Sequence, residues 1–221
     1  MGLSNVTGAS SILQPGVCTS TTRPASPYDG QVIYETDTDK VAVYDVNAWV
    51  YKTGTSHVAP ALVLISSTTI GSGVTSVTVS NCFSSTYENY KIIVIGGVGS
   101  AAGILNTTFG STATGYYQGL IYLPYNTASG IFAANIQNRT SFVLGGYSTD
   151  QIFVTAEIFA PNLAKRTAFS CLRTIIGTNA EAGFVSGFEN SATQHTSFTM
   201  TTESSHTLTG GTIRVYGYTN S

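Results

Sequence analysis

From residue 61 onward the chain is a succession of short apolar and aromatic runs, most of them ended by Gly, Asn, Ser or Thr. The apolar spacing of an amphipathic helix, at i, i+3, i+4 and i+7, is not sustained in any window. Strand-like runs separated by turn signals every about 8–12 residues are typical of an all-β sandwich or jelly roll. The expected strands are residues 61–66, 74–79, 90–96, 104–109, 116–123, 131–136, 141–144, 151–159, 166–176, 183–188, 197–202 and 212–218.

Two of these runs alternate strictly, which predicts a buried and a solvated face for each strand. The first run places Ile152, Val154, Ala156 and Ile158 opposite Phe153, Thr155, Glu157 and Phe159. The second run places Ile213, Val215 and Gly217 opposite Arg214, Tyr216 and Tyr218. We therefore expect residues 61–221 to form an antiparallel, jelly-roll-like β-sandwich domain.

Charged residues make up only 9% of the chain, against about 25% in typical soluble domains. The solvent faces of its strands must therefore carry hydroxyl groups, and little charge repulsion keeps such a protein monomeric. Only Lys165 and Arg166 are adjacent among the nine basic residues, so no basic patch for nucleic acid is expected. No apolar run approaches the about 20 residues of a membrane-spanning helix, so no membrane insertion is expected.

Residues 23–51 contain three shorter strand-like runs joined by tight turns, which predicts a small β-meander. The runs are residues 31–35, 41–45 and 49–51. A three-stranded meander of this size is too small to bury its own core, so it must pack on another surface, most simply on copies of itself. Trp49 is the only tryptophan, and we expect it to be buried against Tyr34, Tyr44 or a neighbouring protomer.

The order of residues in this segment resembles a small module of structural proteins from tailed bacteriophages. The segment reads RPASPYDGQ, then IYETDT, a VY strand and a closing AWV. In that family the module occurs in fibres, fibre-like appendages and related virion components, which are usually trimers. The resemblance implies a homotrimeric virion component made in the bacterial host cytoplasm, with residues 23–51 as its trimerisation module. Looser resemblances to virion β-domains occur in FSSTYENYKIIV and in the terminal GTIRVYG.

Residues 1–22 are rich in Ser, Thr, Gly and Asn, with isolated apolar residues such as Leu3, Ile12 and Leu13. Such a segment has no core-forming pattern, and we expect an extended arm that becomes ordered only on a partner surface. We interpret it as the attachment arm that docks on other virion proteins of the tail or capsid. Residues 52–60 read as a linker. The first residues lack the basic and apolar regions of a signal peptide.

Sequence signals for chemistry are few. Residues 97–103, GVGSAAG, follow a strand-like run, but no amphipathic helix comes after them, so we expect a loop between strands and no dinucleotide site. No G-x-S-x-G elbow marks a hydrolase. A depolymerase would need a paired-carboxylate site, which the 11 acidic residues hardly supply. We therefore expect neither an enzyme nor a cofactor.

Two sets of residues are candidates for metal binding or for disulfide formation. Glu35, Asp37 and Asp39 alternate, and three copies of them could hold a divalent ion at a trimer axis, although an exposed turn is favoured. The three cysteines, which are far apart and odd in number, are expected to be free thiols. They are Cys18, Cys82 and Cys171. A bridge between Cys82 and Cys171 across the sandwich is the alternative.

The sequence supports two candidate functions. The first is a trimeric fibre-like appendage, anchored by its arm with the sandwich outward, with a capsid decoration or head fibre as its alternative location. The second is a carbohydrate-binding β-sandwich whose surface aromatic side chains stack on sugar rings, and the two can coexist on a host-contacting appendage. The candidate glycan contacts are tyrosines in or beside turn-rich segments: Tyr116, Tyr117, Tyr122, Tyr125 and Tyr147.

Overall fold

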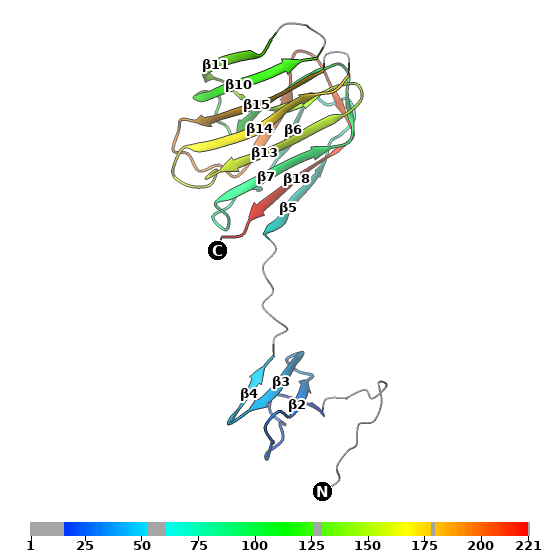
Figure 1. The fold of residues 1–221 in the computed structure, drawn as a ribbon, viewed down its shortest axis with the longest axis vertical. Coiled ribbons are helices and arrows are strands. Elements are labelled where there is room, and N and C mark those ends of the chain that lie inside the picture. The colour runs from blue at the N-terminus through cyan, green and yellow to red at the C-terminus, as the bar shows by residue number, and fades with distance from the viewer. Residues whose placement is uncertain (1–15, 53–60, 126–129, 178–179, 221) are drawn as a thin grey trace. The chain divides into compact units, whose positions relative to one another are not determined.

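The structure is a computed structural model that describes residues 16–52, 61–125, 130–177 and 180–220. The chain divides into two compact units, Met1–Ala59 and Pro60–Ser221, which are described separately (Figure 1). Within the described ranges every helix or strand assigned is a β-strand, so the all-β expectation is confirmed. No helix that could cross a membrane occurs in these ranges.

The first unit is a four-stranded sheet with the order β1-β2-β3-β4. Its strands are β1 (Gly16–Cys18), β2 (Val32–Glu35), β3 (Lys40–Asp45) and β4 (Ala48–Tyr51). The last three strands form the expected antiparallel meander. The expectation of only three strands was wrong, because β1 pairs in parallel with β2 and lies within the segment interpreted as the arm. This pairing satisfies backbone groups that the edge of β2 would otherwise leave open.

The second unit consists of a 12-stranded sheet that folds into two layers, and a two-stranded ribbon. The predicted strands all occur, with ends shifted by a few residues. The strands of the layers are β5 (Leu62–Thr69), β6 (Ser76–Val79), β7 (Asn89–Ile95), β9 (Gly103–Phe109), β10 (Tyr116–Pro124), β11 (Phe132–Arg139), β12 (Phe142–Tyr147), β13 (Ile152–Phe159), β14 (Thr167–Ile175), β15 (Glu181–Glu189), β16 (Phe198–Thr202) and β18 (Thr212–Tyr218). The ribbon pairs β8 (Val98–Gly99) with β17 (Leu208–Thr209).

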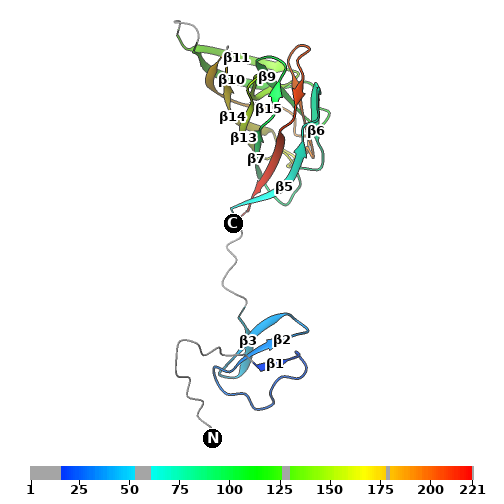
Figure 2. The same cartoon turned by 90° about the vertical axis from the view of Figure 1, so that its right-hand side faces the viewer.

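The front layer of this unit is an antiparallel sheet with the order β11-β10-β15-β14-β13-β7-β18-β5, which Figure 1 shows face-on. The back layer has the order β12-β9-β16-β6. The turn between β12 and β13 joins the layers, with Tyr147 paired to Ile152. In Figure 2, β6 and β9 lie to one side of β13 and β14. The β-sandwich expectation is therefore confirmed.

An aromatic core lies between the two layers. Phe142 stacks on Phe169 with ring centroids 4.0 Å apart, and the alternation predicted for β13 buries Ile152, Val154, Ala156 and Ile158. Close-packed aromatic side chains dominate core energetics and hold the strands rigidly. The fully buried rings are Phe83, Phe109, Phe142, Phe169, Phe198, Tyr90, Tyr116 and Tyr147.

Candidate functional site

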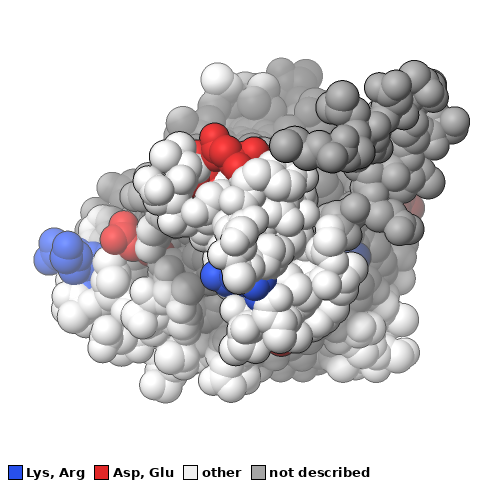
Figure 3. Space-filling view, turned by 90° about the horizontal axis from the view of Figure 1, so that it is seen from below, with Lys and Arg blue, Asp and Glu red and all other residues white. Residues whose placement is uncertain are grey.

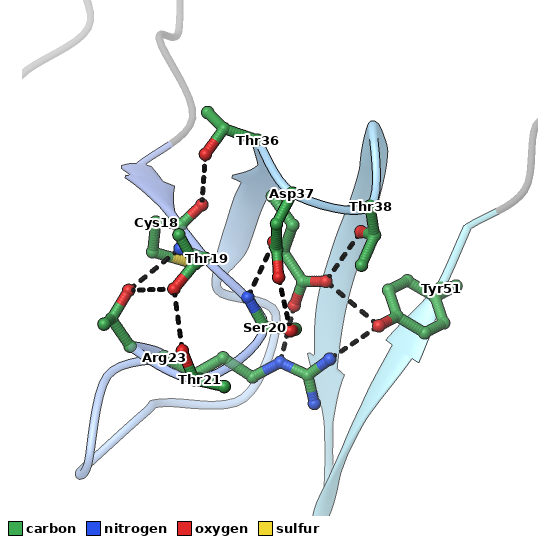
Figure 4. A network of polar contacts seen from close by, with 11 residues as sticks. Cys18, Thr19, Ser20, Thr21, Arg23, Thr36, Asp37, Thr38 and Tyr51 are labelled. Carbon is green, nitrogen blue, oxygen red and sulfur yellow. Dashed lines mark hydrogen bonds and ion pairs between the residues drawn. The ribbon is translucent and has the colours of Figure 1, made fainter.

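The small sheet is organised around Glu35, a fully buried carboxylate at the end of β2. Arg23, in the connection between β1 and β2, donates from Nε to Oε1 of Glu35 at 2.5 Å. The hydroxyls of Thr38 and Tyr51 donate to Oε2 at 2.9 and 3.0 Å (Figure 4). Burying a carboxylate is costly unless it is paired and hydrogen-bonded, and these partners meet that requirement. The network therefore fastens the long connection onto one face of the sheet.

The hydrogen bond from Arg23 lowers the pKa of Glu35 below its ordinary value, against the opposing effect of desolvation. The pKa of Asp37 is also lowered, mainly because the Ser20 hydroxyl donates to it at 2.5 Å. Asp39 accepts a hydrogen bond from Tyr34 instead. The three carboxylates thus have separate partners, and no cluster of three metal-ligating side chains occurs among the described residues. Asp37 and Asp39 lie in the turn favoured from the sequence, whereas Glu35 ends a strand.

The opposite face of the small sheet displays a row of branched apolar side chains. The strand register places Val32 beside Val43, and Val43 beside Val50. Val32, Val41 and Val50 are 42%, 38% and 39% exposed, and Val17 of β1 is 70% exposed. We call this surface the valine face; it consists of Val17, Val32, Val41, Val43 and Val50, with Tyr34 among them.

Within the described part of this unit, Ile33 and Ala42 are the only buried hydrophobic residues. They lie opposite each other on the face covered by the Arg23 connection. Such a small buried set contributes only a few kcal/mol of hydrophobic free energy, at about 1.5–3 kcal/mol for a large aliphatic side chain. The unit therefore leaves more apolar side chains open than it buries, as the sequence predicted for a module that needs a further surface.

The aromatic residues expected to pack together in the meander divide between its two faces. Tyr44 and Trp49 are direct cross-strand neighbours, with centroids 5.3 Å apart in an edge-to-face arrangement. Tyr34 lies opposite Val41 on the valine face. The predicted burial of Trp49 is not complete in a single protomer, because its side chain is only half-buried.

The attachment-arm residues Leu3, Ile12 and Leu13 lie outside the described residues, as does most of the expected linker. All three cysteines are free thiols, which excludes the bridge between Cys82 and Cys171 in this structure. Residues 97–103, expected to be a loop between strands, follow β7 and end at the first residue of β9, but Val98–Gly99 among them form the short strand β8. Gly97 is required there, because a Cβ at this position would lie 2.1 Å from the Gly210 carbonyl oxygen.

The five tyrosines expected to contact glycan have different environments. Tyr116 and Tyr147 are completely buried, so the expectation that they are surface contacts was wrong. Tyr122 is half-buried and covered by the Arg173 guanidinium, 4.2 Å above its ring. Tyr125 is 72% exposed, beyond the end of β10. Tyr117 lies on the outer face of β10 and stacks on Phe188 with centroids 5.1 Å apart.

The structure also contains a pocket of about 600 Å³ beside β9, β10 and β11, with both polar and apolar side chains in its lining. Its polar and charged lining residues include Asn106, Gln118, Arg139 and Arg173. Gln118 is held by a hydrogen bond from the Val143 amide at 2.9 Å, and Arg173 pairs with Glu181 at 2.5 Å. Glu181 therefore neutralises Arg173, and Arg139 is the second basic side chain of the lining.

Charged residues are sparse on the surface drawn in Figure 3, where Lys, Arg, Asp and Glu are scattered among uncharged side chains. Comparisons with protein-family models, curated protein sequences and solved structures found no match to this chain.

Proposed function

We propose that the chain is a structural component of a bacteriophage virion, a homotrimeric fibre-like appendage. The observation that carries the proposal is the valine face, which is an exposed apolar surface on a sheet that has few buried side chains. Three copies that join their valine faces around an axis would remove these side chains from water. A trimer of this kind has closed cyclic symmetry, in which each chain contacts its two neighbours around the axis. The resemblance of residues 23–51 to virion modules supports the trimer and the phage setting.

In this proposal the N-terminal residues dock on other virion proteins, and the sandwich is the outward part. Because β1 belongs to the small sheet, we propose residues 1–15 of the expected arm as the docking segment. The sandwich suits an outward role because its aromatic core is independent of the small sheet: its buried cluster is drawn entirely from residues 70–215. Nothing in this role requires catalysis. The head and the tail of the particle are both compatible with it.

The direct test is immunogold labelling of purified phage particles with an antibody raised against the sandwich. The proposal predicts labels at a fixed site on the particle, on the tail or on the capsid. The proposal would be contradicted if cells that express the chain produce particles that carry no label and contain no chain detectable by mass spectrometry. A matched lysate with the gene disrupted supplies the background.

A further inference from the structure

A groove crosses the outer face of the front sheet, at right angles to its strands. The register aligns five residues on this face, one from each of five neighbouring strands. In order they are Asn135 of β11, Gly119 of β10, Ser186 of β15, Ser170 of β14 and Glu157 of β13. With neighbouring strands about 4.8 Å apart, the row is on the order of 20 Å long.

Larger apolar side chains form the two walls of this groove. On one side Tyr117 and Phe188 stand as a stacked pair with an interplanar angle of 8°. On the other side Ile121, Phe184 and Leu172 are direct cross-strand neighbours, 53%, 49% and 44% exposed. The hollows between the walls have volumes of about 440, 420 and 170 Å³. The two larger hollows share Gly119, Asn135 and Ser186 and are continuous, and the smallest hollow, over Ser170 and Glu157, adjoins them at Phe184.

Gly119 differs from the two glycines of the neighbouring strand β15, which the packing of the strands requires. A Cβ added at Gly183 or Gly187 would lie 2.1 or 2.0 Å from a carbonyl oxygen of β10, so the fold requires those two glycines. A Cβ added at Gly119 would meet nothing within 4 Å, and no left-handed φ is needed there. Glycine inside a strand weakens it by about 0.5–1 kcal/mol relative to Ala, and often marks the close approach of a ligand. No neighbouring atom therefore requires a glycine at position 119.

The polar groups of the groove fit an uncharged ligand rich in hydroxyl groups. Asn135 provides an amide at one end, and Ser186 and Ser170 provide hydroxyls along the floor. Glu157 is already paired, with Lys91 at 2.8 Å and the Tyr218 hydroxyl at 2.7 Å. The walls offer aromatic edges and faces to apolar C–H groups. Sugar rings combine apolar C–H faces with hydroxyl rims, which matches this alternation of walls and floor.

We propose that the groove over Gly119 is a binding site for a neutral polysaccharide chain, laid across β11, β10, β15, β14 and β13. The proposal rests on the outward role of the sandwich for its biological setting, whereas the binding chemistry belongs to the groove alone. It replaces the buried Tyr116 and Tyr147 as glycan contacts and retains Tyr117 as part of a wall.

An extended peptide is a poorer occupant. Peptides that add to a sheet do so through main-chain hydrogen bonds at an open edge. Here Gly119 and Ser186 lie in strands that are paired on both sides, so their backbone groups are already used. A second copy of this chain is the other alternative occupant, and the native mass of the groove variants tests for it.

The test uses the full-length protein on an array of purified bacterial surface polysaccharides, followed by titration calorimetry with the best neutral binder. Gly119→Ile should fill the groove and weaken binding at least tenfold. Ser76→Ile is the matched control, because Ser76 is exposed on β6 in the other layer. Asn135→Ala, on the outermost strand of the front sheet, is a second variant that removes a polar contact without adding bulk.

The proposal requires that the wild-type protein and Ser76→Ile bind alike and that both groove variants bind more weakly, with unchanged native mass and a melting temperature no lower than that of the wild type. Absence of neutral-polysaccharide binding by the wild type overturns it, and so does equal binding by Gly119→Ile or Asn135→Ala. A change of native mass in Gly119→Ile overturns it in favour of a second copy as the occupant. Immunogold labelling is independent of these results, so the appendage role can fail or stand separately.

Discussion

Arg23 and Glu35 form a 2.5 Å ion pair in which the carboxylate is fully buried and the guanidinium is partly exposed. The two residues are 12 positions apart, one in the connection after β1 and the other at the end of β2. Arg23 also donates to the Tyr51 hydroxyl at 2.7 Å, which brings β4 into the same network. The pair therefore couples the proline-containing connection between β1 and β2 to the sheet.

This pair makes the small sheet sensitive to acid. The folded pKa of Glu35 is lowered from 4.5, so its stabilising contribution is full above that value and is lost as the pH falls through the lowered pKa. Trp49 is the only tryptophan and lies in this sheet, so its fluorescence reports on this unit alone. We predict a fluorescence transition below pH 4.5 in the wild-type protein. In Glu35→Gln the change of Trp49 fluorescence with pH should weaken. An unchanged acid transition in that variant would show that other groups control the transition.

The edge-to-face contact of Tyr44 with Trp49 should be measurable as a coupling. Aromatic pairs of this kind contribute about 0.5–1.5 kcal/mol beyond area burial. A double-mutant cycle of Tyr44→Ala and Trp49→Ala, followed by calorimetry of the small unit, should give a value in that range. The same cycle with Tyr34→Ala is the control, and we predict near-additivity because Tyr34 lies on the other face. Equal coupling in both cycles would contradict the assignment of faces.

The three thiols should differ in reactivity. Desolvation raises the pKa of Cys82 to about 12 and that of Cys171 to about 12, and both residues are buried, whereas Cys18 is partly accessible. Thiolates are the reactive species, so a maleimide should label only Cys18 in the native protein. Mass spectrometry should find three labels after denaturation without reductant, because all three thiols are free. Rapid native labelling of Cys82 or Cys171 would contradict this burial.

Deletions at the N-terminus should separate attachment from folding. Removing residues 1–15 should leave a folded trimer that is not incorporated into particles. Removing residues 1–22 should also weaken the small sheet, because it deletes β1 and the hydrogen bonds from Ser20 to Asp37 at 2.8 and 2.5 Å. Trp49 fluorescence and particle incorporation distinguish the two effects. Normal copy number in particles with the shorter deletion would place the attachment site elsewhere.

The strands of the sandwich were predictable because their period-two patterns survive in single sequence windows. Ile152–Phe159 and Thr212–Tyr218 have the buried and open faces that the alternation predicted. β1 was missed because Gly16, Val17 and Cys18 are too few to show a period, and its pairing partner lies 17 residues away.

The surface sites were less predictable, because they depend on which face of a strand points outward. Tyr116 and Tyr117 are adjacent, and alternation alone does not say which of them enters the core. The groove depends on the register of five strands, since Gly119 and Ser186 become neighbours only in the sheet. The alternation of residues 32–35 and 40–45 predicts two different faces for the small sheet. It does not show which face stays open, because that depends on the Arg23 connection, which covers the opposite side.

Substitution on the valine face should disrupt the proposed assembly. Val41→Glu places a charge on the valine face, opposite Tyr34, and should convert the trimer largely to monomer. Val46→Glu is the matched control, because Val46 lies in the turn between β3 and β4 and is 68% exposed. We predict no change of native mass in the control. Equal effects of the two substitutions would argue against the valine face as the interface.

The most direct test of the trimer is the native mass of the full-length protein at micromolar concentration, measured by light scattering coupled to size exclusion. The valine-face account predicts a particle three times the 23.2 kDa mass of one chain, stable on dilution and lost in Val41→Glu. A stable 23.2 kDa monomer would contradict the account.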